Sequence, residues 1–210
     1  MKDVVVVFAR APRLGAVKRR LARDIGDRGA LRFHVATLNR LLRTLTSERR
    51  FRTVLAITPE RVRLRLPVTV ERIGQGAGDL GTRMHRAFVR FPGARVALIG
   101  CDIPDAGPHD ALAAFRALGI ADAAFGPAAD GGYWLVAMSP RRPARPFAAV
   151  RWSTEHALAD TLANFAGRRV ALLRTLDDVD TVEDLRRLNR SAAPVRRAVR
   201  HATRGRVPSR

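Results

Sequence analysis

Short apolar runs alternate with longer amphipathic stretches along this chain. Residues 4–8 form a continuous β-branched and aromatic run, which is typical of a strand buried on both faces of a sheet. Over residues 30–46, leucines recur at helical spacing with arginines on the other face, which predicts an amphipathic helix. Similar patterns predict strands over 53–57, 68–73, 95–99, 121–126, 133–137 and 169–173, and helices over 17–25, 80–91, 110–118, 154–165 and 182–188.

The alternation of strands with helices predicts an α/β fold, with a mostly parallel sheet covered by helices on both faces. We expect one domain over residues 1–189, because a chain of 210 residues can bury a full core. Residues 190–210 are rich in arginine and poor in apolar residues, so we expect a peripheral tail there.

Two absences limit the class of protein. The chain has no apolar run of eighteen residues, so no membrane span is expected, and its first apolar run is too short for a signal peptide. Cys101 is the single cysteine, which excludes a disulfide within the chain and a cysteine-based zinc site. A cytoplasmic location is the expectation.

The formal net charge of +20 favours anionic partners such as phosphates. Compositional drift in a GC-rich genome is an alternative reason for choosing arginine over lysine. A non-enzymatic, basic nucleic-acid-binding protein is a further alternative. The sequence lacks aromatic residues interleaved with basic ones and lacks a recognition-helix motif, so nucleic acid is not the expected partner. The oligomeric state stays open.

In open α/β sheets, ligands bind beyond the carboxyl ends of the strands, so the loops that follow strands are the candidate sites. The first such loop, residues 9–22, contains Gly15 and the basic side chains of Arg10, Lys18 and Arg20. It opens a helix, whose N-terminus attracts phosphate, so we predict phosphate binding, with a solvated basic turn as the alternative. It matches neither a Walker A loop nor G-x-G-x-x-G.

The second loop, residues 74–84, is rich in glycine. Gly76 and Gly78 would let the backbone lie against a nucleoside, although a plain flexible loop is an alternative. Together the two loops give the predicted nucleotide-binding set: Ala9, Arg10, Gly15, Lys18, Gly76, Gly78, Asp79 and Arg83.

The third loop places Asp102 at the end of an apolar strand, where it is suited to hold Mg²⁺ or Mn²⁺. Asp105 is a candidate helix cap, and Cys101 is expected to be a packed small residue. In the fourth loop, Asp130 precedes two glycines and suits either acceptor binding or a hairpin turn. Tyr133, which follows them, is more typical of a core than of a stacking platform, as is its neighbour Trp134.

Near the end of the chain, residues 177–185 carry five carboxylates. Thr181 and Asp184 match a helix capping box, with Asp in place of Glu. This pairing leaves Asp180 free to point elsewhere, and a metal is one candidate partner. The five histidines show no ligand-like spacing, and we assign them no catalytic role.

Taken together, these segments resemble the DUF2064 family, also called radical-SAM/selenodomain-associated transferase 1, some members of which are named arsenosugar-biosynthesis glycosyltransferases. The resemblance covers residues 1–188 and rests on six motifs in order: FARAPRLGAVKRRLA, GDLGTRM, IGCDIPD, GPAADGGYWL, WST and DVDTVEDL. It implies a three-layer, Rossmann-like nucleotide-diphospho-sugar transferase (GT-A) fold with a mostly parallel mixed sheet. The sequence departs from the usual family pattern at Leu14, Arg19, Cys101 and Ala129.

The resemblance implies that Lys18 and Arg20 contact phosphates, that Asp102 holds the metal, and that Asp180 is a second metal ligand. With Asp130 orienting the acceptor, the expected activity is metal-dependent glycosyl transfer from a nucleoside-diphosphate-sugar to a small-molecule acceptor. The alternative is a guanylyltransferase-like nucleotidyl transfer, in which an NTP joins a phosphorylated small molecule and pyrophosphate departs. A fold without turnover is a further alternative.

Overall fold

The structure is a computed structural model that describes residues 2–188 and residue 190. Its seven strands are β1 (Asp3–Arg10), β2 (Phe51–Thr58), β3 (Glu71–Gly74), β4 (Val96–Gly100), β5 (Ala123–Pro127), β6 (Tyr133–Met138) and β7 (Val170–Leu172). Its long helices are α1 (Arg19–Ser47), α2 (Leu80–Val89), α3 (Pro108–Ala117) and α4 (Ala157–Ala163), and residues 182–188 are also helical. The predicted tail lies, apart from residue 190, outside the described residues.

All seven strands belong to one sheet in the order β3-β2-β1-β4-β6-β5-β7. Every pairing is parallel except those of β6, which runs antiparallel to both β4 and β5. The sheet is therefore mostly parallel and mixed, and the predicted fold class is confirmed.

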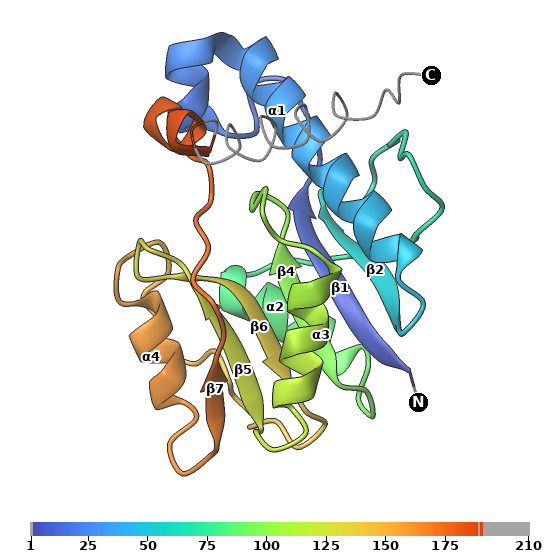
Figure 1. The fold of residues 1–210 in the computed structure, drawn as a ribbon, viewed down its shortest axis with the longest axis vertical. Helices are drawn as coiled ribbons and strands as arrows, with labels where there is room; N and C mark the ends of the chain where they lie inside the picture. The colour runs from blue at the N-terminus through green and yellow to red at the C-terminus, as the bar shows by residue number, and fades with distance from the viewer. Residues whose placement is uncertain (1, 189, 191–210) are drawn as a thin grey trace, which may run out of the picture.

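The sheet forms the middle of three layers (Figure 1). Val5 and Val7 of β1 pack into a core cluster that contains residues of α1 and α3. Their neighbours Val4 and Val6 point to the opposite face, where a second cluster contains residues of α2. Side chains alternate between the faces of a strand, so an unbroken apolar run such as Val4–Val7 is what a strand covered on both sides requires.

The helix boundaries agree with the prediction at one break and differ at another place. Gly26 has φ 72° and ψ 159°, which are not helical, so α1 consists of two helical stretches that meet at a kink there, between the two predicted helices. α4 is shorter than the predicted helix over 154–165, and Ser153 ahead of it adopts a left-handed φ of 63°. Of the described helices, none combines the length and apolar character needed to cross a membrane.

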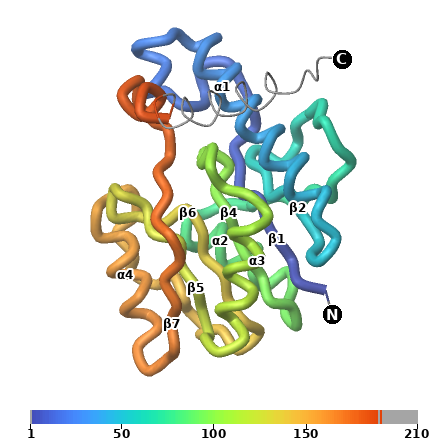
Figure 2. The backbone as a smooth tube through the Cα atoms, viewed as in Figure 1, coloured from blue at the N-terminus to red at the C-terminus, as the bar shows by residue number. Residues whose placement is uncertain are grey.

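The segment after β7 returns across the end of the sheet. Leu173 and Leu176 donate backbone hydrogen bonds to Phe125 and Pro127 of β5, so the chain continues in extended form beyond the last strand. It then reaches the beginning of α1, beside which the helical residues 182–188 lie (Figure 2). This path brings residues near position 180 to the loop that follows β1.

Candidate functional site

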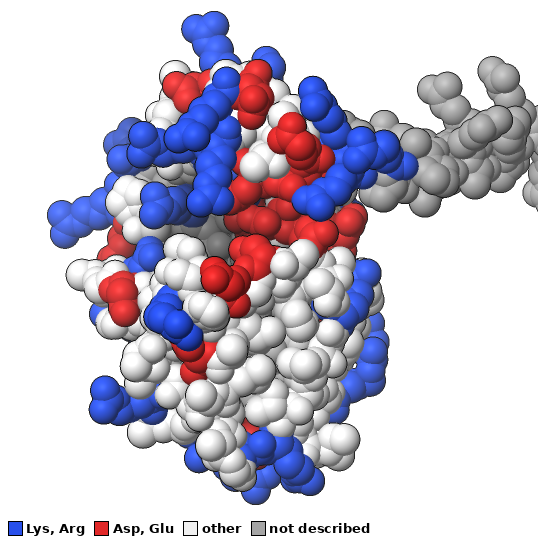
Figure 3. Space-filling view, turned by 90° about the vertical axis from the view of Figure 1, so that its left-hand side faces the viewer, with Lys and Arg blue, Asp and Glu red and all other residues white. Residues whose placement is uncertain are grey.

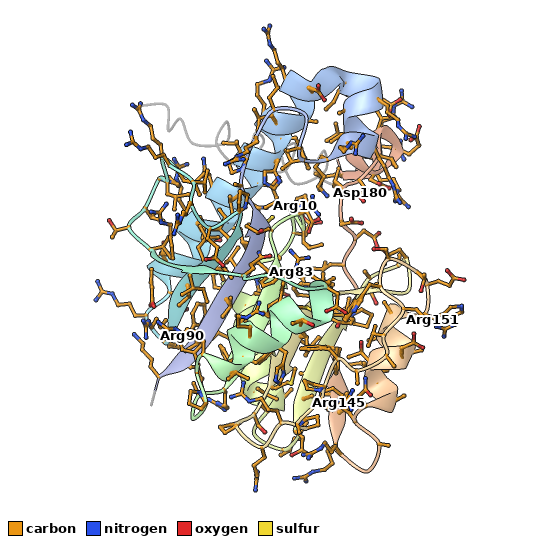
Figure 4. The ribbon with its side chains drawn as sticks, turned by 180° about the vertical axis from the view of Figure 1, so that it is seen from behind. Arg10, Arg83, Arg90, Arg145, Arg151 and Asp180 are labelled. Carbon is orange, nitrogen blue, oxygen red and sulfur yellow. The ribbon has the colours of Figure 1, made fainter. Side chains whose placement is uncertain are left out.

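The candidate site lies where the strand order changes direction. β1 connects through α1 to β2 on one side, whereas β4 lies on its other side, so the loops after β1 and β4 separate at a crevice. Lys18 belongs to the first of these loops and Asp102 to the second. Figure 4 shows Arg10, Arg83 and Asp180 at this end of the sheet, with Arg90 and Arg145 towards the other end.

Three carboxylates from distant parts of the chain meet at this crevice. Asp102, Asp178 and Asp180 each offer an oxygen, and these oxygens all lie within 4.8 Å of one another. The Nζ atom of Lys18 lies 2.6 Å from Asp180, 3.1 Å from Asp102 and 3.9 Å from Asp178. The predicted metal residues are therefore brought together, with an ammonium group among them.

The backbone of Lys18 is constrained in a way that suits a functional residue. It precedes α1 in the left-handed region, with φ 48° and ψ 49°, which non-glycine residues adopt rarely. Its side chain is only 6% exposed. Burial acts to lower the pKa of Lys18, but the charges of Asp102 and Asp180 outweigh it and the pKa is raised, so the ammonium stays charged.

Asp178 is a member of this cluster that the sequence analysis missed. Burial and the charge of Asp180 raise its pKa to about 7, and the attraction of Lys18 offsets this only in part. The signal was present in the sequence, because alternate residues of an extended segment point the same way, and Asp178 is two residues from Asp180. Val179, between them, is buried. Asp177 lines a different pocket together with Asp105 and Asp178.

The chemistry of the donor set fits a divalent cation. The three carboxylates have two cationic partners, the buried ammonium of Lys18 and the exposed guanidinium of Arg20, which lies 3.9 Å from Asp180. The acidic groups outnumber the basic ones, so the cluster carries excess negative charge. Carboxylate oxygens are the ligands that Mg²⁺ and Mn²⁺ prefer. Asp102, Asp178 and Asp180 are the residues that would hold such an ion.

A cationic pocket of about 430 Å³ has Asp102 in its lining. Among the charged residues of the lining, the aspartates Asp102 and Asp180 are outnumbered by basic residues: Arg10, Lys18, Arg19, Arg20 and Arg83. Figure 3 shows acidic side chains gathered across the middle of one face of the molecule, with basic side chains bordering them. A diphosphate group suits this pocket, because guanidinium and ammonium groups bind phosphate oxygens strongly.

Gln75 is a second residue that the sequence analysis missed. It is buried and donates hydrogen bonds from Nε2 to the carbonyl oxygens of Ala9 and Ala56, at 3.0 and 2.9 Å. Its Oε1 accepts a 3.0 Å hydrogen bond from Arg83. Gln75 therefore fixes the Arg83 side chain to the ends of β1 and β2. A glutamine between glycines gave no signal of this role.

His34 also lines the cationic pocket, where its contacts suit a structural role in holding the loop after β1. Its Nε2 lies 3.0 Å from the backbone oxygen of Arg10. Burial lowers the pKa of His34, which favours the neutral ring. The ring therefore helps to position the loop after β1.

The predicted nucleotide-binding residues divide into two groups. Ala9, Arg10, Lys18 and Arg83 line the cationic pocket. The other four shape the loops around it: Gly15, Gly76 and Gly78 have positive φ values, and Asp79 caps α2 by accepting a 2.8 Å hydrogen bond from the Thr82 amide. A direct contact of these four with a nucleotide stays a prediction.

A second pocket, of about 330 Å³, shares Asp102 with the cationic pocket. It is lined by Asp130, Asp178, Tyr133, Trp134 and Trp152, among others. The two tryptophans of the chain thus lie at the same cavity. Trp134 is also buried in the core, as the sequence indicated, and its indole donates a hydrogen bond to the backbone oxygen of Arg174.

Asp130 stabilises the turn of the β5–β6 hairpin and also lines the second pocket. Its Oδ1 accepts a 2.9 Å hydrogen bond from the Gly132 amide, in the turn between the antiparallel strands β5 and β6. The intervening Gly131 has φ +82°, and a Cβ there would lie 2.2 Å from the Glu155 oxygen. The turn therefore presses against the segment before α4, and both contribute to the pocket wall.

Of the two predicted helix caps, one is confirmed and one is wrong. Oδ2 of Asp184 accepts hydrogen bonds from the Thr181 amide and hydroxyl, and the Thr181 hydroxyl accepts from the Asp184 amide, which is the expected capping box. Asp105 does not cap α3. Gly107 is the N-cap, and its amide donates to Asp110, because Pro108 supplies the first helical residue.

Cys101 is buried next to the site, which predicts an inert thiol. Burial raises its pKa to about 12, and the Asp102 charge acts in the same direction. Since the thiolate is the reactive form, we expect iodoacetamide at pH 8 to leave Cys101 unmodified in the folded protein. Mass spectrometry should show full alkylation after denaturation in guanidinium. Rapid alkylation of the native chain would contradict the packed role.

Solved structures with this fold include nucleotide-handling proteins. A Desulfovibrio desulfuricans G20 protein, described as a candidate nucleotide-diphospho-sugar transferase, is 29% identical, with a TM-score of 0.85 over 91% of this chain and 88% of its own. The 4-diphosphocytidyl-2C-methyl-D-erythritol synthase of Anaerococcus prevotii is 12% identical, with a TM-score of 0.56 over 87% and 94%. The second likeness concerns the fold alone.

Mycobacterium tuberculosis Rv0371c is 19% identical, with a TM-score of 0.52 over 89% of this chain and 96% of its own, and it has also been solved in complex with manganese. A search of curated proteins found no significant match. The profile of the family described as "Uncharacterized protein conserved in bacteria (DUF2064)" matches residues 41–154, more than half of the sequence. The chain has the nucleotide-diphospho-sugar transferase fold and belongs to the DUF2064 family.

Proposed function

We propose that this protein is a transferase that uses a divalent cation to move the sugar of a nucleoside-diphosphate-sugar to a small-molecule acceptor. One observation carries the proposal: two pockets of opposite character meet at Asp102, which lines both. Such an arrangement suits a donor in one pocket and an acceptor in the other, with one reacting centre between them.

The donor diphosphate belongs in the cationic pocket. Arg10 and Arg83 at its mouth, with Lys18 and Arg20 near the carboxylate cluster, supply charge for the phosphate oxygens. When the sugar leaves, negative charge grows on the diphosphate, and fixed cations stabilise that charge in the transition state. A bound divalent ion supplies further charge neutralisation at this diphosphate.

The acceptor belongs in the second pocket, with its hydroxyl directed to Asp102. In the transfer, a bond forms between the acceptor oxygen and the anomeric carbon, and the bond from that carbon to the diphosphate breaks. The hydroxyl proton passes to the carboxylate of Asp130. The products are a glycosylated acceptor and a free nucleoside diphosphate.

Two comparisons support the proposal. The Desulfovibrio protein, the one of the three at more than 25% identity, is described as a candidate nucleotide-diphospho-sugar transferase. The Mycobacterium protein with the same fold has been solved with manganese, and the carboxylate cluster here offers a donor set for such an ion.

The proposal is tested by thermal-shift measurements with a panel of UDP-, GDP-, dTDP- and CDP-sugars, with and without Mn²⁺. We expect at least one donor to raise the melting temperature only when Mn²⁺ is present, because an ion held by Asp102, Asp178 and Asp180 would neutralise the charge of the diphosphate. The same donor, incubated with the enzyme and a set of alcohols, should release nucleoside diphosphate. Release of pyrophosphate from an NTP instead would favour nucleotidyl transfer, and no stabilisation by any nucleotide would contradict both activities.

A further inference from the structure

We propose that the second pocket accepts an uncharged or cationic hydroxyl compound with an apolar portion, and that it rejects phosphate esters. This inference rests on the proposed function, because it names the acceptor class for the same site. It concerns the binding step alone, so it can be tested without turnover.

The charges around the pocket are the first support. Asp102, Asp130 and Asp178 line it, whereas none of the described residues in its lining is a lysine or an arginine. The chain contains 39 such residues, and five of them line the adjacent pocket. An acidic pocket in so basic a chain would repel a phosphate group.

Basic groups nearby are already paired with carboxylates. Lys18 is held by Asp102 and Asp180 at 3.1 and 2.6 Å. Arg151, next to the lining residue Trp152, forms a two-pronged pair with Asp160 at 2.8 and 2.9 Å. A phosphate ester in the second pocket would therefore meet carboxylates before it met a free cation among these groups.

The other residues that line the second pocket indicate which chemical groups a ligand would need. Leu80, Met84 and Ile103 supply aliphatic surface, and the rings of Tyr133 and Trp152 lie edge to face with centroids 6.4 Å apart. Ser153 and Thr154 add hydroxyl groups, which can exchange hydrogen bonds with an alcohol. An apolar body carrying hydroxyl groups complements this mixture.

The charges of the second pocket distinguish glycosyl transfer from nucleotidyl transfer. Nucleotidyl transfer to a phosphorylated acceptor requires the pocket to hold a phosphate group. Asp130, which is not among the residues that would hold the ion, opposes this, and the lining has no lysine or arginine among the described residues. Glycosyl transfer to an alcohol has no such requirement, so the pocket favours it.

Tryptophan fluorescence provides the test, since Trp134 and Trp152 are the two tryptophans of the chain and both line this pocket. Three probes share a phenyl group: phenyl β-D-glucoside is neutral, 2-amino-1-phenylethanol is cationic, and phenyl phosphate is anionic. The full-length protein is titrated with each, without nucleotide or metal, and with inorganic pyrophosphate present to occupy the cationic pocket. We expect the first two to bind at least tenfold more tightly than phenyl phosphate.

Asp130→Asn should weaken binding of the cationic probe and strengthen binding of phenyl phosphate severalfold, with the neutral probe unchanged. Glu155→Gln is the matched control, because Glu155 has an exposed carboxylate outside the pocket lining, and its removal should alter none of the three affinities. Equal or tighter binding of phenyl phosphate would overturn the inference, as would a lack of response to both hydroxyl probes. A missing metal-dependent nucleotide effect would instead count against the proposed function and leave this titration readable.

Discussion

Asp102→Asn is expected to remove metal-dependent nucleotide binding and to lower transfer by about 100-fold or more. Asp102 contacts Lys18, belongs to the carboxylate cluster and lines both pockets, so no other side chain can replace its position. Changes to residues that merely support metal ligands already cost about 10- to 100-fold, and loss of a ligand should cost more. Thermal shifts with a nucleotide-sugar, with and without Mn²⁺, measure the effect.

Asp105→Asn is the matched control for this variant. Asp105 lies three residues further along the same loop, is exposed, and lines neither of the two pockets that meet at Asp102. It should keep both the Mn²⁺-dependent stabilisation and the transfer rate. If Asp102→Asn behaved like this control, the carboxylate cluster would not be the metal centre.

Lys18→Met is expected to tighten Mn²⁺ binding in the absence of nucleotide by tenfold or more, while transfer falls about 100-fold. The ammonium lies within 3.9 Å of all three carboxylates, so it competes with a cation for the same oxygens. Its removal leaves carboxylates facing one another, which should cost about 2 kcal/mol of stability, given their partial exposure. For a chain of this size that is a decrease of about 4–8 °C in melting temperature.

Calorimetric titration with MnCl₂ and thermal melts of the metal-free protein measure the two effects. Mn²⁺ should restore most of the lost melting temperature in Lys18→Met, since it replaces the missing positive charge. Arg13→Met provides the control, because this exposed residue of the same loop lies outside the cluster. Weaker Mn²⁺ binding by Lys18→Met would show that the lysine supports the metal instead of competing with it.

The central strands of the sheet could be predicted because they are buried on both faces and therefore contain unbroken apolar runs, as in Val4–Val7. Helix ends were harder to predict. The break within α1 is an exception: Gly26 lies between the two predicted helices, and glycine adopts its positive φ without steric cost. Ahead of the start of α4, Ser153 has a left-handed backbone and Arg151 pairs with Asp160. Neither feature has a sequence signature.

Site residues could be predicted where a charged residue stands directly after a buried strand or at the start of a helix. Asp102 follows a buried strand and Lys18 opens a helix, so their proximity follows from the parallel order of β1 and β4. The salt bridge between them could not be foreseen, because it depends on the αL backbone of Lys18. Gln75 was missed because its partners Ala9 and Ala56 lie far away in the sequence. Asp178 was missed although its two-residue spacing from Asp180 was visible in the sequence.

The return path of the chain after β7 has a consequence for biosynthesis. A nascent polypeptide that has emerged only as far as Leu172 contains every strand of the sheet, but of the three clustered carboxylates it has Asp102 alone. Asp178 and Asp180 leave the ribosome afterwards and are joined to Lys18, which was made about 160 residues earlier. The carboxylate cluster is thus completed only after the last strand of the sheet has been made, and a product that ended between Leu172 and Asp178 would lack two of its three carboxylates.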